Sequence, residues 1–274
     1  MISAARQSSP PAVEAPRRRD YISWSAIGTY ASCPLRYYFR YVAGLPERAV
    51  SSSLVFGGAV HRAVEHQFNE LLAGNEPPCL EALLGEYHQH WLDLDGQTVH
   101  FGEKDDAASL EVLARRMLTA FQSSPLALPE GNILGVEEEL RGPIVAGCPD
   151  VLGRLDLIVE TSKAVIISDL KTSRSRWSRE QVDDSAGQLL LYHELARDFA
   201  PGKQLRLQFA VITKAKEPSV ELHEVTADAQ QLDRTKRIVE RVWQAIAAGS
   251  FYPAPSPLSC PSCSFREPCR AWHG

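Results

Sequence analysis

The sequence lacks any apolar run long enough to cross a membrane. Apolar runs such as Ala164 to Ile167 are far shorter than the roughly 18 residues that a membrane-spanning helix needs. A secretory signal is also missing, because Pro10, Pro11 and Pro16 stand where its apolar core would have to lie. These absences predict a cytoplasmic protein. In a reducing compartment its six cysteines are better explained as metal ligands or ordinary thiols than as disulfides.

An excess of positive charge is absent too. The 274 residues include 29 basic and 34 acidic side chains, so the net charge is −5. This balance argues against nucleic-acid binding by bulk electrostatics alone, but it leaves room for a local basic groove. Hydrophobic residues make up 44% of the chain, which is enough to bury a core without disulfides.

The N-terminal part of the chain has the pattern of a tail followed by helices. Residues 1–20 are rich in Ser, Pro and Arg and predict a disordered tail, whereas residues 21–274 predict one domain. Ser23 is a candidate N-cap for a helix that ends at Cys33–Pro34. The helical part extends to about residue 125, with further helices expected over Leu54–Leu72, 80–92 and 107–122.

The pattern then changes to short runs rich in Val, Ile and Leu, which predict a sheet core over about residues 130–250. A helix is expected at about 180–199, and another from a cap at Thr226 to Ala248. The strands are expected at 133–140, 151–159, 164–170, 205–213 and 219–225. Together these elements predict an α/β fold. The closing segment, residues 251–274, is rich in Pro, Ser and Cys and reads as too irregular for a helix.

Two carboxylates and a lysine interrupt strands that otherwise look buried. Asp156 lies in GRLDLIV, and Asp169 and Lys171 lie in VIISDLKT. Because strand side chains alternate, Asp169 and Lys171 share a face, and Asp156 joins them if the two strands form a hairpin. A lone Asp-x-Lys is most often a surface ion pair. Buried acids, however, need a partner or a metal, and two carboxylates suit Mg²⁺ or Mn²⁺.

A basic stretch follows directly. Arg174, Arg176 and Arg179 add to Lys171, and residues 171–179 contain no acid. This local excess predicts a phosphate-binding lip and marks these arginines as candidate DNA contacts. Trp177 either stacks on a base or covers the core. Gln188 and Tyr192 share a helix face on the following segment.

Three cysteines near the C-terminus form a C-x₂-C-x₅-C group of Cys260, Cys263 and Cys269. Three thiolates so close together indicate a bound cation, with Cys33 as the best placed fourth ligand. Spacing alone leaves both zinc and an iron–sulfur cluster open. Either metal would join the two ends of the fold. Cys79 and Cys148 are expected to be ordinary thiols.

Taken together, these motifs resemble those of the PD-(D/E)XK nuclease superfamily, and within it the RecB-type exonucleases, including the CRISPR-associated exonucleases with an iron–sulfur cluster. The similarity extends from about Ser23 to Cys269. Five segments carry it, in this order: SWSAIGTYASCPLRYYFRY, GGAVHRAVE, GRLDLIV with ISDLKTS, GQLLLYHEL and CPSCSFREPC. One departure is that Leu155 stands where the superfamily's name has a proline.

The resemblance implies a restriction-endonuclease-like core, in which a central mixed sheet is flanked by helices and a helical N-terminal insertion precedes it. It implies that His61, Asp156, Asp169 and the carbonyl of Leu170 bind Mg²⁺ or Mn²⁺, and that Lys171, Gln188 and Tyr192 complete the catalytic site. It further implies a structural [4Fe–4S] cluster on Cys33, Cys260, Cys263 and Cys269 that joins the N- and C-terminal segments, with structural Zn²⁺ as the alternative.

The implied function is metal-dependent hydrolysis of DNA. We expect an exonuclease that acts on single-stranded or end-containing DNA in repair, recombination or CRISPR-like processing. The alternative is a DNA-end-binding or scaffold subunit of a helicase–nuclease complex, with a helicase as its partner. The sequence leaves open the polarity, the strand preference, the pathway and the oligomeric state.

Overall fold

The computed structural model describes residues 19–273 apart from residues 48, 95, 104 and 198–200. The predicted disordered tail therefore lies almost entirely outside the described residues, as does the last part of the helix expected at about 180–199. In the described part of the chain, no helix combines the length and the apolar character that a membrane span requires.

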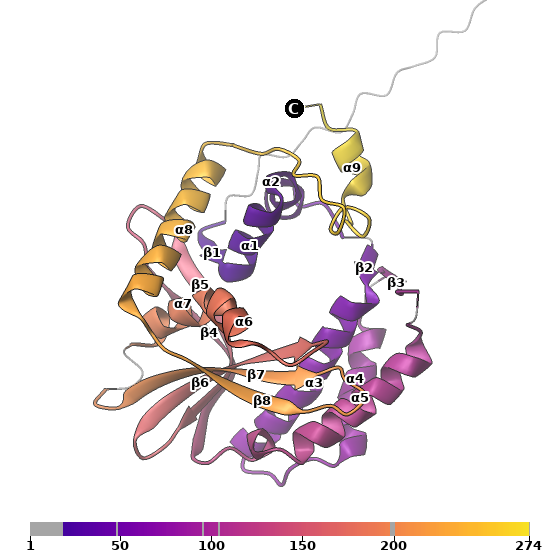
Figure 1. Cartoon of the computed structure of the whole chain (residues 1–274), viewed down its shortest axis with the longest axis vertical. Coiled ribbons are helices and arrows are strands. Elements are labelled where there is room, and N and C mark those ends of the chain that lie inside the picture. Colours follow the sequence, from indigo (N-terminus) through magenta and orange to yellow (C-terminus); the bar gives the residue numbers. More distant parts are fainter. Residues whose placement is uncertain (1–18, 48, 95, 104, 198–200, 274) are drawn as a thin grey trace, which may run out of the picture.

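A mixed six-stranded sheet forms the centre of the fold (Figure 1). Its strands are β1 (Tyr21–Ser23), β4 (Asn132–Gly142), β5 (Asp150–Glu160), β6 (Ala164–Ser173), β7 (Gln204–Thr213) and β8 (Val220–Val225). The pairs β1–β5 and β6–β7 are parallel, and the pairs β4–β5, β5–β6 and β7–β8 are antiparallel. Two short strands, β2 (Ala49–Ser51) and β3 (Thr98–His100), pair separately.

Strand β5 is the branch point of this sheet. One of its edges is paired with β4 from Val151 to Glu160. The other edge is shared: β6 takes residues 157–160 and β1 takes residues 150–152. On the side of the pair Leu157–Ser168 that leads to Asp156 and Asp169, β5 and β6 therefore separate. The backbone groups of the two strands no longer pair with each other there. Asp156 is the first β5 residue past this separation.

The helices of the N-terminal half cover one face of the sheet (Figure 1). Small and branched side chains on α3, such as Ala59 and Val60, are fully buried against α4, α5 and the sheet residues Leu170 and Ile212. The elements are α1 (Trp24–Ser32), α2 (Pro34–Tyr37), a π-helix (Tyr38–Val42), α3 (Ser52–Leu72), α4 (Leu80–Leu92), α5 (Ala107–Gln122) and a 3₁₀ turn (Pro125–Ala127).

Local chemistry explains where these helices begin. The Ser23 side chain accepts a hydrogen bond from the backbone N–H of Ala26 and caps α1, as the sequence predicts. Cys33 ends that helix, and Pro34 starts α2 at a position where a missing N–H costs nothing. Helix α3 starts at Ser52 rather than Leu54, because Ser51 supplies its cap by accepting from the N–H of Leu54.

On the opposite face lie α6 (Arg179–Ser185) and α7 (Gly187–Ala196), with α8 (Ala229–Ala247) beside them (Figure 1). The prediction of one helix at about 180–199 is wrong, since the chain breaks at Ala186. A side chain at Gly187 would collide with the ring of Trp24, which its Cβ would approach to 2.5 Å. The missing side chain at Gly187 thus lets Trp24 of α1 pack closely against α7.

Two further predictions for the C-terminal part are wrong. Helix α8 is capped by Asp228, which accepts from the N–H groups of Gln230 and Gln231, and not by Thr226. The closing segment also contains a short helix, α9 (Arg266–Arg270). Burial of Phe265 against Phe39 fixes the start of α9, which compensates for the weak helical pattern of the sequence.

The C-terminal segment packs on the N-terminal elements, and Figure 1 shows α9 close to α2. The N–H of Leu35 donates to the carbonyl of Tyr252 at 2.9 Å, and the Tyr30 hydroxyl donates to the carbonyl of Ser250 at 2.6 Å. Phe251 stacks on Tyr37 with a centroid distance of 6.3 Å. The two ends of the described chain are therefore in direct contact.

Candidate active site

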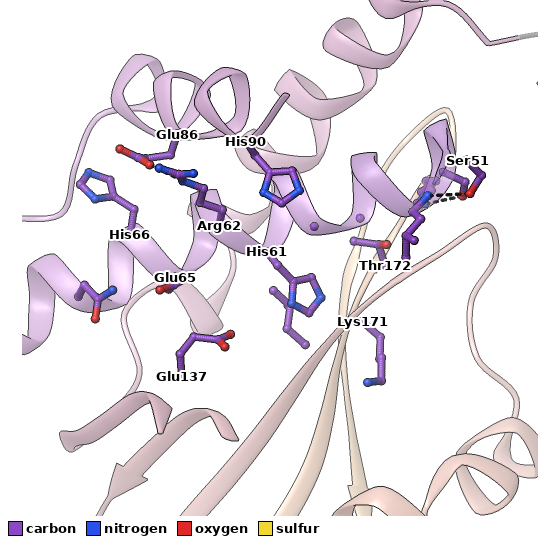
Figure 2. Close-up of a pocket in the computed structure, with 17 residues that line it drawn as sticks. Ser51, His61, Arg62, Glu65, His66, Glu86, His90, Glu137, Lys171 and Thr172 are labelled. Atoms are coloured by element: carbon purple, nitrogen blue, oxygen red, sulfur yellow. Dashed lines mark hydrogen bonds and ion pairs between the residues drawn. The ribbon is translucent and has the colours of Figure 1, made fainter. Parts of the chain in front are cut away.

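Three side chains from three different elements converge where β5 and β6 separate. His61 comes from the middle of α3, Glu137 from β4 and Asp156 from β5, and their ligand atoms all lie within 4.8 Å of one another. His61 Nδ1 is 3.9 Å from Asp156 Oδ2. Figure 2 shows His61 and Glu137 pointing into the same hollow. One imidazole and two carboxylates form a donor set that suits a divalent cation such as Mg²⁺ or Mn²⁺.

Glu137 is the site residue that the sequence reasoning missed. Its run, VEEEL, reads simply as a strand, because three successive glutamates do not indicate which of them turns inward. In the structure, Glu137 has a φ of 52°, the only positive φ of a described non-glycine residue, and β4 carries a register shift between Ile133 and Gly135. Such irregularities redirect side chains at functional sites.

Asp156 is held by the separated backbone of the sheet. Its Oδ2 accepts a hydrogen bond of 2.6 Å from the N–H of Leu170. In a regular sheet the N–H of Leu170 would donate to a backbone carbonyl of the neighbouring strand. Because β5 and β6 have separated at this point, it donates to the Asp156 carboxylate instead. Leu155 and Ile158 face α7, whereas Leu157 packs under α3. The alternation of β5 is thus interrupted at Asp156, between the two cores.

Asp169 and Lys171 point to the face of β6 that carries α7, and Leu170 points to the face under α3, as the alternation predicts. Lys171 Nζ lies 2.5 Å from Asp169 Oδ2 and donates to Gln188 Oε1 at 3.0 Å. Gln188 Nε2 in turn donates to the Tyr192 hydroxyl at 2.7 Å. Lys171 is therefore part of a connected row of four side chains, in which Asp169 and Gln188 hold its ammonium group and Tyr192 holds Gln188.

Burial sets the protonation behaviour of the site. It raises the pKa of Asp156 well above 3.8, and the neighbouring charges of Asp169 and Glu137 raise it further. Burial also raises the pKa of Asp169, although the positive charge of Lys171 lowers it in part. Burial raises the pKa of Glu137 as well, and the negative charge of Glu65 raises it further. Clustered acids with raised pKa values favour the uptake of a cation, which relieves their mutual repulsion.

His61 is arranged to act as a neutral ligand. Burial and the positive charge of Lys171 lower its pKa to about 4, so the imidazole is uncharged at neutral pH. Metal binding requires this form. Gly57 and Gly58 precede His61, and a Cβ on Gly57 would approach Thr172 Oγ1 to 3.3 Å. The absence of side chains there lets α3 cross close to the end of β6.

Two hollows flank this group of residues. One has a volume of about 1030 Å³ and is lined by His61, Glu137, Leu170 and Lys171, among others (Figure 2). The other, of about 830 Å³, is lined by Asp156, Gln188 and Tyr192. The site is therefore open on two sides, and each hollow is large enough for more than a single nucleotide-sized group.

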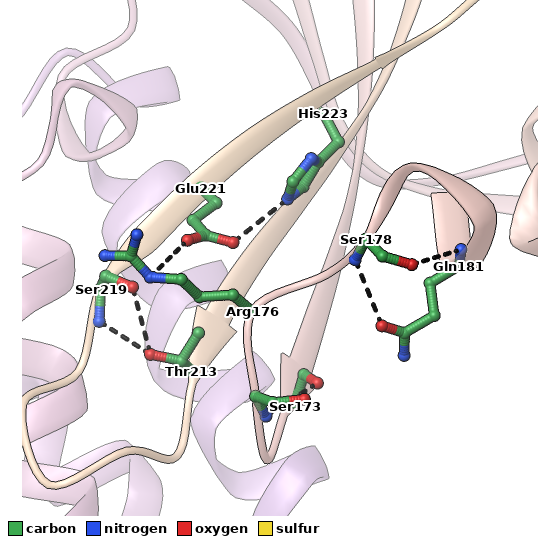
Figure 3. A network of polar contacts seen from close by, with 9 residues as sticks. Ser173, Arg176, Ser178, Gln181, Thr213, Ser219, Glu221 and His223 are labelled. Atoms are coloured by element: carbon green, nitrogen blue, oxygen red, sulfur yellow. Dashed lines mark hydrogen bonds and ion pairs between the residues drawn. The ribbon is translucent and has the colours of Figure 1, made fainter. Parts of the chain in front are cut away.

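The predicted basic lip occupies a different place. Figure 3 shows Arg176 beside Glu221, with Nε 3.0 Å from the carboxylate, and Arg179 Nε lies 3.5 Å from Asp183. Trp177 packs on Phe209 with a centroid distance of 5.1 Å and stacks on His223, so it covers the core. None of these three side chains lines either hollow. Arg174 is closer, since its charge lowers the pKa of Lys214 in the first hollow.

The cysteines also come together as the sequence suggests. Burial raises the pKa of Cys269, and the charges of Cys33, Cys263 and Cys260 raise it further, so the four sulfur atoms are neighbours. Cys33, Cys263 and Cys269 pack around Leu35, Phe39 and Phe265. Cys79 and Cys148 stand apart from this group. All six cysteines are free thiols in the structure.

A solved structure of low sequence identity has a similar fold. A crystal structure of a candidate exonuclease from Eubacterium rectale aligns with a TM-score of 0.57 and 17% identity, covering 98% of this chain and 95% of that one. A likeness of this kind shows a shared fold. The crystal structure of SSO0001 aligns with a TM-score of only 0.35 at 16% identity, over 88% of this chain and 92% of that one. No curated protein matches the chain.

A family model of the PD-(D/E)XK nuclease superfamily matches residues 21–270. This range contains the separated strands, the three elements that carry His61, Glu137 and Asp156, and the C-terminal cysteines. Members of the superfamily act as nucleases on DNA and use divalent metals. The chain belongs to the PD-(D/E)XK nuclease superfamily.

Proposed function

We propose that the protein is a metal-dependent deoxyribonuclease, and specifically an exonuclease acting on single-stranded or end-containing DNA. The observation that carries the proposal is the convergence of His61, Glu137 and Asp156 within 4.8 Å, beside a lysine held by a buried aspartate. This combination of cation ligands and one fixed ammonium group suits phosphodiester hydrolysis.

In this proposal each residue has one task. His61, Asp156, Asp169 and the carbonyl of Leu170 hold the cation, and Glu137 joins them. When bound, Mg²⁺ or Mn²⁺ lowers the pKa of a coordinated water and offsets charge on the scissile phosphate. Lys171 orients the attacking water or stabilises the negative charge of the transition state. Gln188 and Tyr192 fix the position of the Lys171 ammonium through the contacts described above.

An exonuclease must accept a free end, and the two hollows on either side of the site give a strand room to enter and leave. The test is hydrolysis of linear and circular DNA, single- and double-stranded, with Mg²⁺ or Mn²⁺. Degradation of linear but not circular single strands is expected. Cleavage of circles would contradict the exonuclease proposal, and no hydrolysis of any substrate would contradict the nuclease proposal.

Lys171→Met is expected to lower kcat by about 10²- to 10³-fold, because it removes a donor that stabilises the transition state. Lys163→Met is the matched control, since Lys163 is exposed at the other end of the same hairpin. The measurement is the initial rate on linear single-stranded DNA at saturating metal. Equal rates for the two variants would remove Lys171 from the site.

Glu137→Gln is expected to raise the Mn²⁺ concentration at half-maximal rate by about 10- to 100-fold, because one anionic group of the donor set is lost. Glu138→Gln is the control, since Glu138 is the next residue of the same strand, is exposed and lines neither hollow. For the parent protein, half-saturation should need less metal as the pH rises, because the metal must displace protons from acids whose pKa values are raised. Unchanged metal dependence of Glu137→Gln would exclude Glu137 as a ligand.

We further propose that Cys33, Cys260, Cys263 and Cys269 hold a structural [4Fe–4S] cluster. The four thiols are neighbours, and the N–H of Ser256 donates to Cys260 Sγ at 3.2 Å, as is usual for cluster sulfurs. Structural Zn²⁺ on the same four thiols is the alternative, and the metal content of the purified protein distinguishes the two.

A further inference from the structure

The hollow of about 830 Å³ extends beyond the candidate site residues Asp156, Gln188 and Tyr192. The rest of its lining includes both cations and aromatic rings. The residues concerned are Arg19, Tyr21, Trp24, Arg40, Tyr41 and Arg154, and we call them the cation–aromatic groove. They come from the segment before β1, from β1 and α1, and from the π-helix and β5, so only the folded chain brings them together.

The cations and rings of this groove are in contact. Arg19 Cζ lies 4.5 Å from the ring centroid of Tyr41 and 5.2 Å from that of Tyr21. Arg40 Cζ lies 5.4 Å from the Tyr41 ring. Tyr21, Trp24 and Tyr41 are only partly buried. Rings left partly open and bordered by guanidinium groups are the surface on which single-stranded nucleic acids stack their bases.

The groove also leads directly to the site. Leu152, Arg154 and Asp156 are two residues apart on β5, and all three line this hollow. Arg154 therefore stands beside the metal-binding Asp156, at the distance of one strand repeat, about 6.7 Å. Acids offset part of the charge, since Arg154 pairs with Glu139 and Arg40 with Glu47 at 2.8 Å. The rings, rather than net charge, distinguish this surface.

We propose that the cation–aromatic groove binds single-stranded DNA, with bases stacked on Tyr41, Tyr21 and Trp24 and phosphates contacted by Arg19, Arg40 and Arg154. This inference rests on the proposed nuclease function, to which it adds the path of the substrate. It moves the main DNA contacts from the loop of residues 174–179 to the other side of the site. The Trp177 ring of that loop is already covered by Phe209 and His223.

The test is the binding of a fluorescein-labelled single-stranded oligothymidylate to the full chain in EDTA, measured by fluorescence anisotropy at several salt concentrations. Tyr41→Leu keeps an apolar side chain against Tyr37 and is expected to weaken binding roughly 5- to 100-fold. Arg19→Gln is expected to reduce the slope of log Kd against log salt by about 0.7, the value for one phosphate contact. Arg176→Gln, at an exposed arginine outside the groove, should change neither.

Unchanged binding by both groove variants would overturn the inference, and so would a loss of binding confined to Arg176→Gln. Hydrolysis by the same proteins with Mn²⁺ separates the two proposals. If the parent degrades DNA and the groove variants keep its KM, the groove inference fails and the nuclease proposal stands. If the parent binds DNA through the groove but hydrolyses none, the nuclease proposal fails and the groove stands.

Discussion

Asp156→Asn is expected to lower the rate of Mg²⁺- or Mn²⁺-dependent DNA hydrolysis by 10³-fold or more, on the order of the loss of a full transition-state contact. Asparagine keeps the size of the side chain and an oxygen that can accept from the N–H of Leu170. It removes only the negative charge that the cation needs. The measurement is kcat on linear single-stranded DNA over a range of metal concentrations.

The matched control is Asp150→Asn. Asp150 follows Pro149 and so imitates the sequence signature of the superfamily, but it begins β5 and pairs with Arg141 at 3.0 Å. Loss of this exposed ion pair should cost less than about 1 kcal/mol and leave hydrolysis intact. If Asp150→Asn abolished hydrolysis and Asp156→Asn did not, the proposed site would be wrong.

The stability of Asp156→Asn shows whether this variant loses hydrolysis because it lacks a metal ligand or because it is unfolded. Because burial raises the pKa of Asp156 in the folded state, the folded metal-free protein binds more protons there than the unfolded chain does. Its stability should therefore fall as the pH rises from about 3.8 through the raised pKa of Asp156. Asp156→Asn should weaken this pH dependence and melt no earlier than the parent at neutral pH. An unfolded Asp156→Asn variant would contradict this account.

Cys33→Ser is expected to remove bound iron and to lower Tm by about 10 °C or more, because the binding energy of a structural metal contributes directly to folding. The effect should be large, since Cys33 ends α1 while the other three thiols lie in the last fifteen residues of the chain. The measurements are iron, sulfide and zinc content of anaerobically purified protein, together with its melting curve.

Cys79→Ser provides the control. Cys79 is exposed and precedes α4 as its N-cap without a side-chain hydrogen bond, so a serine there is neutral or slightly favourable. Equal iron content in the two variants would exclude Cys33 as a ligand. A colourless parent protein that binds one zinc would contradict the iron–sulfur proposal and favour the zinc alternative.

Much of the fold follows from local patterns. Ser23, the long apolar stripe of α3 and the Val- and Ile-rich runs of β5 to β7 place most helices and strands within a few residues of where they lie. The errors occur where a distant contact decides. The chain turns at Ala186, next to the Gly187 on which the Trp24 ring packs, and Phe265 at the start of α9 is buried against Phe39.

The sequence by itself determined the chemistry of this protein: an acid and an Asp-x-Lys on adjacent buried strands, a histidine on a helix after two glycines, and cysteines at ligand spacing. Strand alternation is enough to place Asp169 and Lys171 on one face. Only the tertiary structure decided which groups meet. β1 and β6 share one edge of β5, and Asp156 lies where they part, close to His61 of α3 and to the unforeseen Glu137 of β4. Pairing across a sheet depends on contacts between residues far apart in the chain, and no local pattern records them.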